Sequence, residues 1–162
     1  WQLDGWKHPE DPKVVKESFK DFSGEASKII ASIESVYKWG LFRYPVKKKW
    51  YNDRVILVGD AAHPTLPFLA QGAAMAIEDS FVIASKISKF PKLSFAFNEF
   101  QRERLPRVQR IISASAKNAR TFHLSNVISR LVLHFFLRVL TKFLPHLLVK
   151  RFDWIYDHNV TN

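Results

Sequence analysis

The sequence contains no cysteine, and that absence excludes several functions at once. A disulfide framework, a thiolate metal site and a cysteine nucleophile all need this residue, so an extracellular disulfide-rich scaffold is disfavoured and a reducing cytosol is the expected compartment. Glycine is scarce too: the 162 residues contain five, none spaced as a Gly-x-Gly-x-x-Gly phosphate-binding motif. The opening residues, WQLDGWKHPEDPK, are acidic and contain proline, which is not typical of a secretion signal.

Acidic residues are also few, with 15 Asp and Glu against 25 Lys and Arg, which gives a net charge of +10. That excess makes nucleic acids, anionic membrane surfaces and anionic substrates candidate partners. The basic run at 47–49 is short and has only Trp50 and Tyr51 as neighbouring stacking aromatics. We therefore expect a solvated loop there and no binding to nucleic acid.

Hydrophobic residues make up 47% of the chain, as in a globular protein, and their spacing predicts mostly helices. The predicted helices span residues 14–36, 71–87, 95–119 and 121–144. We expect Ser23-Gly24 to divide the first run into two helices, Pro106 to kink or restart the third, and Pro145 to end the last.

Two strands are predicted among these helices. Residues 38–44 are aromatic and β-favouring, and residues 54–58 form a short apolar run suited to a strand that is covered on both faces. Residues 1–12 are expected to be irregular.

The stretch RVILVGDAAHPTLPFLAQGAAMAIEDS, residues 54–80, combines a strand, a Gly-Asp turn, a proline-containing loop and a helix start. In α/β proteins ligands bind beyond the carboxyl ends of strands. The Asp60 carboxylate there could accept hydrogen bonds from a polyol, and Gly59 would let the backbone approach the ligand. Gly72 begins a helix whose free N–H groups favour negative charge on a ligand. By itself, however, a Gly-Asp pair is common in turns that bind nothing.

The whole stretch resembles the second flavin-binding motif of the FAD-dependent aromatic-ring monooxygenases of the para-hydroxybenzoate hydroxylase type. Later segments, RERLPRVQRIISASAKNARTFH and DWIYDHN, are similar to the salicylate hydroxylase branch. The matching motif residues are Gly59, Asp60, Ala61, Ala62, His63, Pro64, Pro67, Gln71, Gly72, Glu78 and Asp79.

The resemblance implies an α/β fold class: the C-terminal part of a Rossmann-like FAD-binding monooxygenase fold, mostly helical in this chain with a few strands. Residues 1–38 would be the end of the substrate-binding domain. Residues 39–90 would be the segment of the FAD-binding domain that carries the Gly-Asp motif, and residues 91–162 a C-terminal helical region.

It also implies a role for each motif residue. Asp60 would hydrogen-bond the ribityl chain of FAD, and Pro67 would form a wall between the flavin ring and the substrate pocket. The backbone N–H groups of Ala73 and Ala74 would face the N1 and O2 edge of the ring, where the reduced flavin is anionic. Gly59, Gln71 and Gly72 complete the expected cofactor-binding set.

The function implied is hydroxylation of a small, salicylate-like aromatic compound with FAD, NAD(P)H and O2. Because the phosphate-binding glycine motif is missing from this sequence, we expect a preceding segment or a second chain to complete the site, and this chain alone to be inactive. The alternative is a non-catalytic remnant or helical interaction module that holds no flavin.

Three other features have ordinary explanations. We expect His63 to support the loop by hydrogen bonding rather than to act as a base, and Glu78 and Asp79 to hold loops or cap charges, because neighbours on a helix diverge by about 100°. No metal site is expected, because the six histidines lack metal-ligand spacing.

Basic residues recur among apolar ones within residues 120–150. The pattern fits the solvated face of an amphipathic helix packed on the enzyme, or a basic helix in peripheral contact with an anionic membrane. A membrane span is not expected, because charges recur at each turn and Pro145 interrupts the run.

Overall fold

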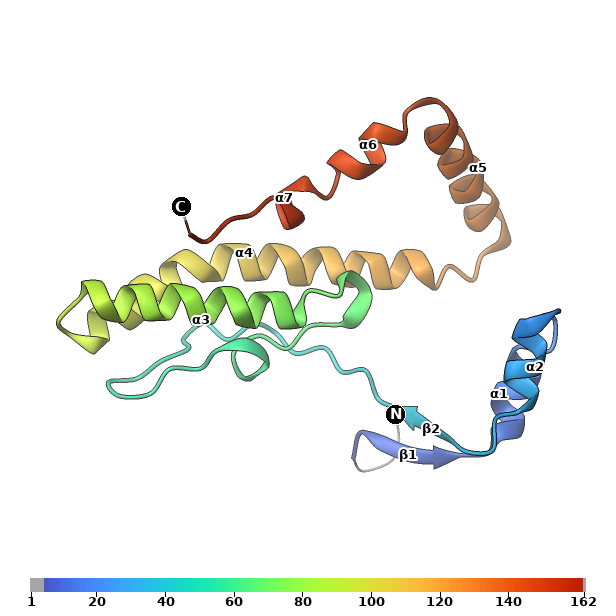
Figure 1. The fold of residues 1–162 in the computed structure, drawn as a ribbon, viewed down its shortest axis with the longest axis horizontal. Helices are drawn as coiled ribbons and strands as arrows, with labels where there is room; N and C mark the ends of the chain where they lie inside the picture. Colours follow the sequence, from blue (N-terminus) through green and yellow to red (C-terminus); the bar gives the residue numbers. More distant parts are fainter. Residues whose placement is uncertain (1–4, 162) are drawn as a thin grey trace. The chain divides into compact units, whose positions relative to one another are not determined.

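The computed structural model describes residues 5–161. It divides into two compact units, Trp1–Phe42 and Arg43–Asn162, and we describe each by itself. Figure 1 shows the helices and strands of both.

The first unit is a two-stranded antiparallel sheet with two short helices between its strands. β1 (Lys7–Glu10) pairs with β2 (Val36–Trp39). The connection between them contains α1 (Pro12–Ser18) and α2 (Glu25–Ala31), which are separated near Ser23-Gly24 as the sequence predicts. Two predictions were wrong: β1 lies in a region expected to be irregular, and the second strand ends at Trp39 instead of continuing to Tyr44.

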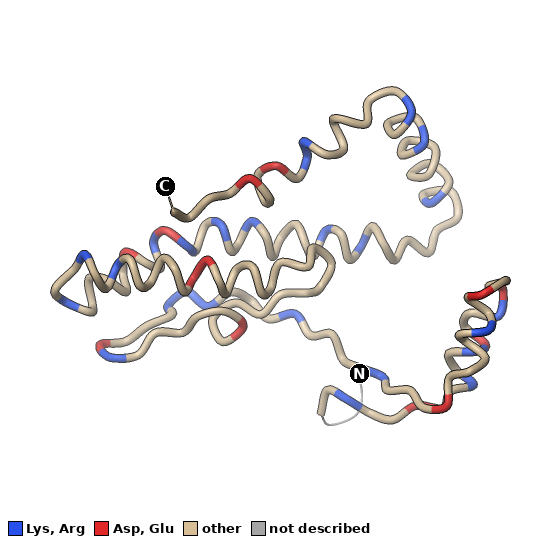
Figure 2. The backbone as a smooth tube through the Cα atoms, in the orientation of Figure 1, with Lys and Arg blue, Asp and Glu red and all other residues tan. Residues whose placement is uncertain are grey.

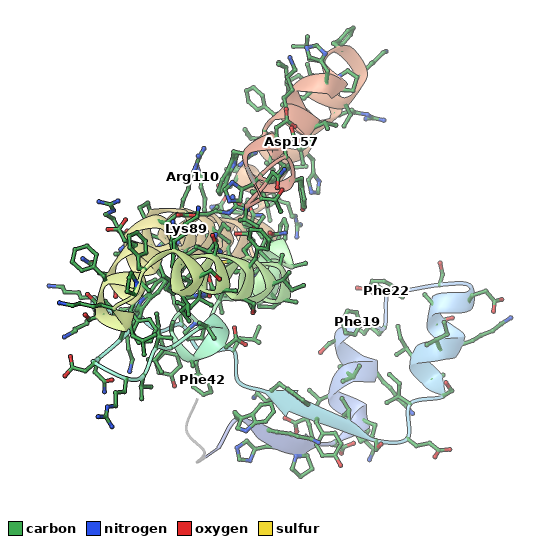
Figure 3. All side chains as sticks on the ribbon, turned by 60° about the vertical axis from the view of Figure 1, so that its left-hand side comes forward. Phe19, Phe22, Phe42, Lys89, Arg110 and Asp157 are labelled. Atoms are coloured by element: carbon green, nitrogen blue, oxygen red, sulfur yellow. The ribbon has the colours of Figure 1, made fainter. Side chains whose placement is uncertain are left out.

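Aromatic side chains replace a continuous core in this small unit. Trp6 and Trp39 meet edge to face with ring centroids 4.7 Å apart. Phe19 and Phe22, which lie at the turn after α1 and are labelled in Figure 3, meet edge to face at 5.4 Å. No residue of α1 or α2 is fully buried.

The second unit is built on two helices that run side by side in opposite directions, α3 (Gly72–Lys89) and α4 (Leu93–Phe122) (Figure 1). Both match predicted helices within a few residues. Pro106 lies inside α4 without ending it, so the helix does not restart there, and the other expectation, a kink at this residue, stays a prediction. The buried hydrophobic cluster comprises Trp50, Ala62, Leu69, Met75, Val82, Phe100, Val108, Ile111, Ile112 and Ile155.

Residues 43–71 lie against this helix pair as an extended segment with two 3-10 turns, η1 (Gly59–Ala61) and η2 (Pro67–Leu69). Trp50 anchors the segment: it is 1% exposed, its backbone N–H donates to Gln101 Oε1 at 2.8 Å, and its indole N–H donates to the Lys47 carbonyl at 2.9 Å. The segment is thereby fixed to α4 before it reaches the Gly-Asp turn.

The strand predicted over 54–58 is not formed. In its place there is one isolated bridge, between Tyr51 and Ile56. Val55 and Val58 are exposed, which is the reverse of the burial expected for a central strand. The physical reason is that a strand needs hydrogen-bonded neighbours on at least one side, and residues 5–161 offer this segment none beyond that bridge.

Three further helices follow: α5 (Val127–Phe143), α6 (Pro145–Lys150) and α7 (Asp153–Tyr156). The break at Pro145 is confirmed, and α5 begins after the predicted Thr121 because Asn126 caps it by accepting a bond from the Ser129 N–H at 3.0 Å. Among the described helices none alone is long and apolar enough to cross a membrane; α4 and α5 pass that test only as a pair bent by 113°.

Candidate functional site

The Gly-Asp turn forms where the extended segment meets α3. Gly59 has a φ of +56°, a conformation that favours glycine, and its N–H donates to Asp79 Oδ2 at 2.9 Å. A Cβ at this position would lie 3.2 Å from the Ala76 Cβ, which is closer than ordinary packing. Both the backbone conformation and the contact with α3 therefore require glycine.

Asp60, the next residue, is exposed and lies in η1, close to the start of α3. A Cβ built on Gly72 would be 3.9 Å from Asp60 Oδ1 and 3.7 Å from Thr65 Cγ2. Within the described chain the Asp60 carboxylate has no hydrogen bond or ion pair. The turn thus presents an acceptor group beside the helix start without using it internally.

The start of α3 lacks a side-chain cap. Gln71 occupies the N-cap position but its side chain makes no capping bond, and the first backbone bond runs from the Met75 N–H to the Gln71 carbonyl at 2.9 Å. The N–H groups of Gly72, Ala73 and Ala74 are consequently free of any acceptor in residues 5–161. Free donors and the positive end of the helix dipole make this end suitable for a partly negative group.

The proline-containing loop is held from behind by α4. Ser115 Oγ donates to the Leu66 carbonyl at 2.7 Å, and Asn118 Nδ2 donates to the Phe68 carbonyl at 3.2 Å. Pro67, between these two anchors, is exposed. Ala70 follows with a φ of +51°, a strained conformation for a residue with a Cβ, and strain of this kind is often found where a loop forms a ligand site.

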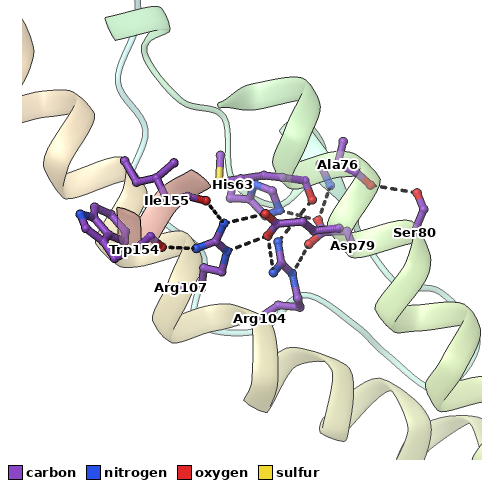
Figure 4. Close-up of polar contacts among 11 residues, drawn as sticks. His63, Ala76, Asp79, Ser80, Arg104, Arg107, Trp154 and Ile155 are labelled. Atoms are coloured by element: carbon purple, nitrogen blue, oxygen red, sulfur yellow. Dashed lines mark hydrogen bonds and ion pairs between the residues drawn. The ribbon is translucent and has the colours of Figure 1, made fainter. Parts of the chain in front are cut away.

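Behind the turn lies a buried network of charged groups (Figure 4). Asp79 on α3 accepts from His63 Nε2 at 2.6 Å and from Arg104 Nε at 2.8 Å, in addition to the Gly59 N–H. All three residues are at most 1% exposed. His63 therefore supports the loop by hydrogen bonding, as expected, and Asp79 fixes the turn to both helices.

Glu78 has a different set of partners. It binds Arg107 with two bonds, from Nε at 2.8 Å and Nη2 at 2.6 Å, and it also pairs with Arg104 Nη1 at 2.6 Å. Arg107 in turn donates to the carbonyls of Trp154 at 3.0 Å and Ile155 at 3.2 Å. Glu78 thus holds the C-terminal segment, whereas Asp79 holds the Gly-Asp turn, so the two adjacent carboxylates do separate work.

The electrostatic balance keeps both carboxyl groups ionised. Burial alone would raise the pKa of Asp79, but the hydrogen bonds from His63, the Gly59 backbone and Arg104 outweigh it and hold that pKa below its ordinary value. Burial would likewise raise the pKa of Glu78. The hydrogen bond from Arg107 and the charge of Arg104 outweigh burial, so the pKa of Glu78 is also below its ordinary value.

Arg104 and Arg107 were not predicted from the sequence as partners of these carboxylates. Their spacing of three residues places them on one face of a helix, and the Glu-Asp pair on the preceding helix was the matching signal. Among the residues described there is no cluster of three metal-ligating side chains.

A family model described as an FAD binding domain matches residues 2–115, which include this site. The chain belongs to the FAD-binding domain family. It is 33% identical over 125 residues to 3-amino-4-hydroxybenzoate 2-monooxygenase PtmB3 of Streptomyces platensis, covering 76% of this chain and 32% of the relative. It is 32% identical over 166 residues to 3-hydroxybenzoate 6-hydroxylase of Polaromonas naphthalenivorans, covering 99% of this chain and 40% of the relative.

Solved structures share the fold of this FAD-binding domain member. A salicylate hydroxylase in complex with its substrate superposes with a TM-score of 0.72 at 24% identity, covering 99% of this chain and 38% of that one. An HpxO variant of Klebsiella pneumoniae bound to FAD superposes at 0.68 and 20% identity, covering 90% and 38%. The resemblance to FAD-dependent aromatic monooxygenases is confirmed, and the chain spans less than half the length of these proteins.

The expected site residues fall into two groups. Gly59, Asp60 and Gly72 meet at the start of α3, with the free N–H groups of Ala73 and Ala74 on its first turn. Gln71 is buried at the N-cap of α3. Pro67 lies on the same loop as Thr65, whose Cγ2 would be 3.7 Å from a Cβ built on Gly72. Their individual roles toward a flavin remain predictions.

Proposed function

We propose that this chain forms the wall of an FAD site that faces the flavin ring and its ribityl chain, in a monooxygenase that hydroxylates a small aromatic compound. The observation that carries the proposal is the exposed Asp60 carboxylate, without a partner in the described residues, beside the uncapped start of α3. An acceptor and a set of free donors next to each other suit a ligand that has hydroxyl groups and an electron-rich ring edge.

The residues present fit FAD in three respects. Asp60 can accept from ribityl hydroxyls, and the amides of Ala73 and Ala74 can donate to the N1 and O2 edge of the ring, where the helix dipole stabilises negative charge. Gly72 carries no side chain, which leaves the space between Asp60 and the helix start open. FAD, when bound, supplies the oxygen and redox chemistry; the chain orients it and shields it from water.

The substrate proposal rests on what the relatives are named for. They include a 3-hydroxybenzoate 6-hydroxylase, a 6-hydroxynicotinate 3-monooxygenase and a 6-methylsalicylate 1-monooxygenase, all acting on small aromatic hydroxy acids. We therefore propose a salicylate-like substrate, NAD(P)H as the reductant and Pro67 as the wall of the substrate pocket. A cytosolic location belongs to the same proposal.

The finer fold assignment is also a proposal. In a complete domain we expect residues 54–58 to join a Rossmann-like sheet, since this apolar segment already ends at the Gly-Asp turn and exposes Val55 and Val58. Residues 1–38, 39–90 and 91–162 would then be the end of the substrate domain, the flavin-contacting segment and the helical region.

The test uses Asp60→Ala in the complete protein, with the remainder of the domain supplied as a preceding segment or a second chain. FAD affinity, measured by fluorescence titration, should fall by about 1.5–3 kcal/mol, the usual worth of a hydrogen bond to a charged group. Asp53→Ala, an exposed carboxylate on the same segment, is the control and should bind FAD normally. Unchanged affinity for Asp60→Ala would remove Asp60 from the site. Absence of FAD binding by the unaltered complete protein would favour the alternative, a helical interaction module that holds no flavin.

A further inference from the structure

α5 and α6, residues 127–150, present apolar side chains to solvent. Neither helix contains a buried residue, and Ile128, Phe135 and Phe143 are 72%, 65% and 67% exposed. Large exposed apolar areas mark interaction sites more often than single exposed residues do. The apolar side of this segment is therefore a candidate interaction surface.

Most of the exposed apolar residues of α5 lie along one side of the helix. At about 100° of rotation per residue, Ile128, Val132, Phe135, Val139 and Phe143 fall within about 80°, and Leu131 and Phe136 widen this apolar sector to about 140°. Arg130, His134 and Arg138 lie outside the sector, as does the exposed Leu137, and Lys142 lies within it near its edge. An apolar side opposed by a cationic side is the pattern of helices that lie in the interface of a membrane.

The charge of this region has one sign. Between Glu103 and Asp153 the chain contains no acidic residue, and α5 shows only basic charges in Figure 2. Arg104 and Arg107 are paired with Glu78 and Asp79, and the other basic residues of the region are Arg110, Lys117, Arg120, Arg130, Arg138, Lys142, Lys150 and Arg151. A second copy of the segment would place cations against cations, so charge complementarity favours an anionic occupant over self-association.

We propose that α5 and α6 form a peripheral docking surface for anionic phospholipid. The apolar sector of α5 enters the acyl boundary, while Arg138 and Lys142, at and beside the edge of that sector, contact the head groups. The helices lie on the membrane and do not cross it, in agreement with the absence of a spanning helix among the described ones. The inference needs no flavin and does not depend on the proposed function.

The test is co-sedimentation of the 162-residue chain with vesicles. We expect binding to an equimolar mixture of phosphatidylserine and phosphatidylcholine, weakening as salt is added, and little binding to phosphatidylcholine alone. The R138E/K142E variant should bind the mixed vesicles more than about tenfold less tightly, because it reverses two contacting charges. K47E/K48E is the matched control, with the same change in net charge in a loop without an apolar sector, and it should bind as the unaltered chain does.

A second variant tests the apolar sector. Phe135→Ser with Phe143→Ser changes two exposed residues, so circular dichroism should show an unchanged helix content while vesicle binding is lost. Equal binding to both kinds of vesicle, or retained binding by R138E/K142E, would overturn the proposal. Competition by inorganic phosphate at constant ionic strength would overturn the proposal in favour of a site for free anions. If the chain does not bind vesicles but forms an oligomer that the two serine substitutions abolish, the surface is instead an interface with a second copy of the chain.

Discussion

At the scale of single residues, Gly59 has two separate reasons to lack a side chain. Its φ of +56° disfavours a Cβ, and a Cβ there would lie 3.2 Å from that of Ala76. We expect Gly59→Ala to lower the free energy of unfolding by about 1–3 kcal/mol, measured by urea denaturation. Ala76→Gly should recover the packing part of this cost in the double variant. Strictly additive effects of the two substitutions would show that the contact with Ala76 does not constrain the turn.

Asp79 gives a prediction about pH. Its pKa is lowered in the folded chain, so the stability that its ionised form contributes is present above the ordinary carboxyl range of about pH 4 and is lost as the pH falls through the lowered value. Asp79→Asn should therefore be less stable than the unaltered chain at neutral pH and should lose less stability on acidification. Urea denaturation as a function of pH measures both, with exposed Asp53→Asn as the control. Parallel pH profiles for Asp79→Asn and the unaltered chain would contradict this account.

Residue roles could be predicted where a local pattern carried them and not where they depended on packing. Gly59, Asp60 and Gly72 were selected from a contiguous motif, and they do meet in space. The partners of Asp79 could not be selected in the same way, because Arg104 lies 25 residues away and its pairing depends on how α4 packs on α3. A single sequence provides that packing only indirectly.

At the scale of secondary-structure elements, the α3 and α4 pair depends on Arg104, which contacts carboxylates at two successive positions of α3. Arg104→Leu would leave Asp79 buried without its arginine partner and remove one of the ion pairs of Glu78. Because an uncompensated buried charge costs more than the pair contributes, we expect a loss of about 3–5 kcal/mol in the free energy of unfolding.

The control for this substitution is Arg102→Leu, two residues away on the same helix. Arg102 is 75% exposed at its side chain and pairs with Glu99, an arrangement whose loss costs about 0–1 kcal/mol. Thermal or urea denaturation of both variants gives the comparison. Similar losses for the two arginines would mean that burial of the network does not matter.

Elements differ in how far the sequence determines them. α3 and α4 follow from helical periodicity, since a helix satisfies its backbone hydrogen bonds within its own segment. The segment at 54–58 has the composition of a strand but no neighbouring strand in the described part of the chain. Its local pattern was as clear as that of the two helices, yet the predicted strand was wrong because a strand depends on a partner elsewhere in the chain. β1 shows the opposite case, because its pairing with β2 depends on residues nearly thirty positions later.

At the scale of the whole molecule, the second unit has one buried cluster that joins residues from Trp50 to Ile155, so the Gly-Asp turn, both long helices and the C-terminal segment form one structural body. Arg107 extends that body through its bonds to the carbonyls of Trp154 and Ile155. The candidate flavin wall is accordingly supported by buried contacts, whereas Asp60 is exposed and the first N–H groups of α3 have no acceptor in the described residues.

The lack of a pyrophosphate-binding motif predicts how the 162-residue chain behaves toward FAD. Its donors and acceptors match the flavin ring and ribityl chain, but the sequence contains no Gly-x-Gly-x-x-Gly motif to bind the pyrophosphate, and it spans only 32–40% of the relatives compared above. We therefore expect the chain purified alone to be colourless and to show no flavin absorbance after gel filtration with excess FAD. Addition of the complementary part of the domain should restore retention, and Asp60→Ala should weaken it there. Yellow protein from the isolated chain would mean that the start of α3 and its turn bind FAD strongly enough without any contact to the pyrophosphate.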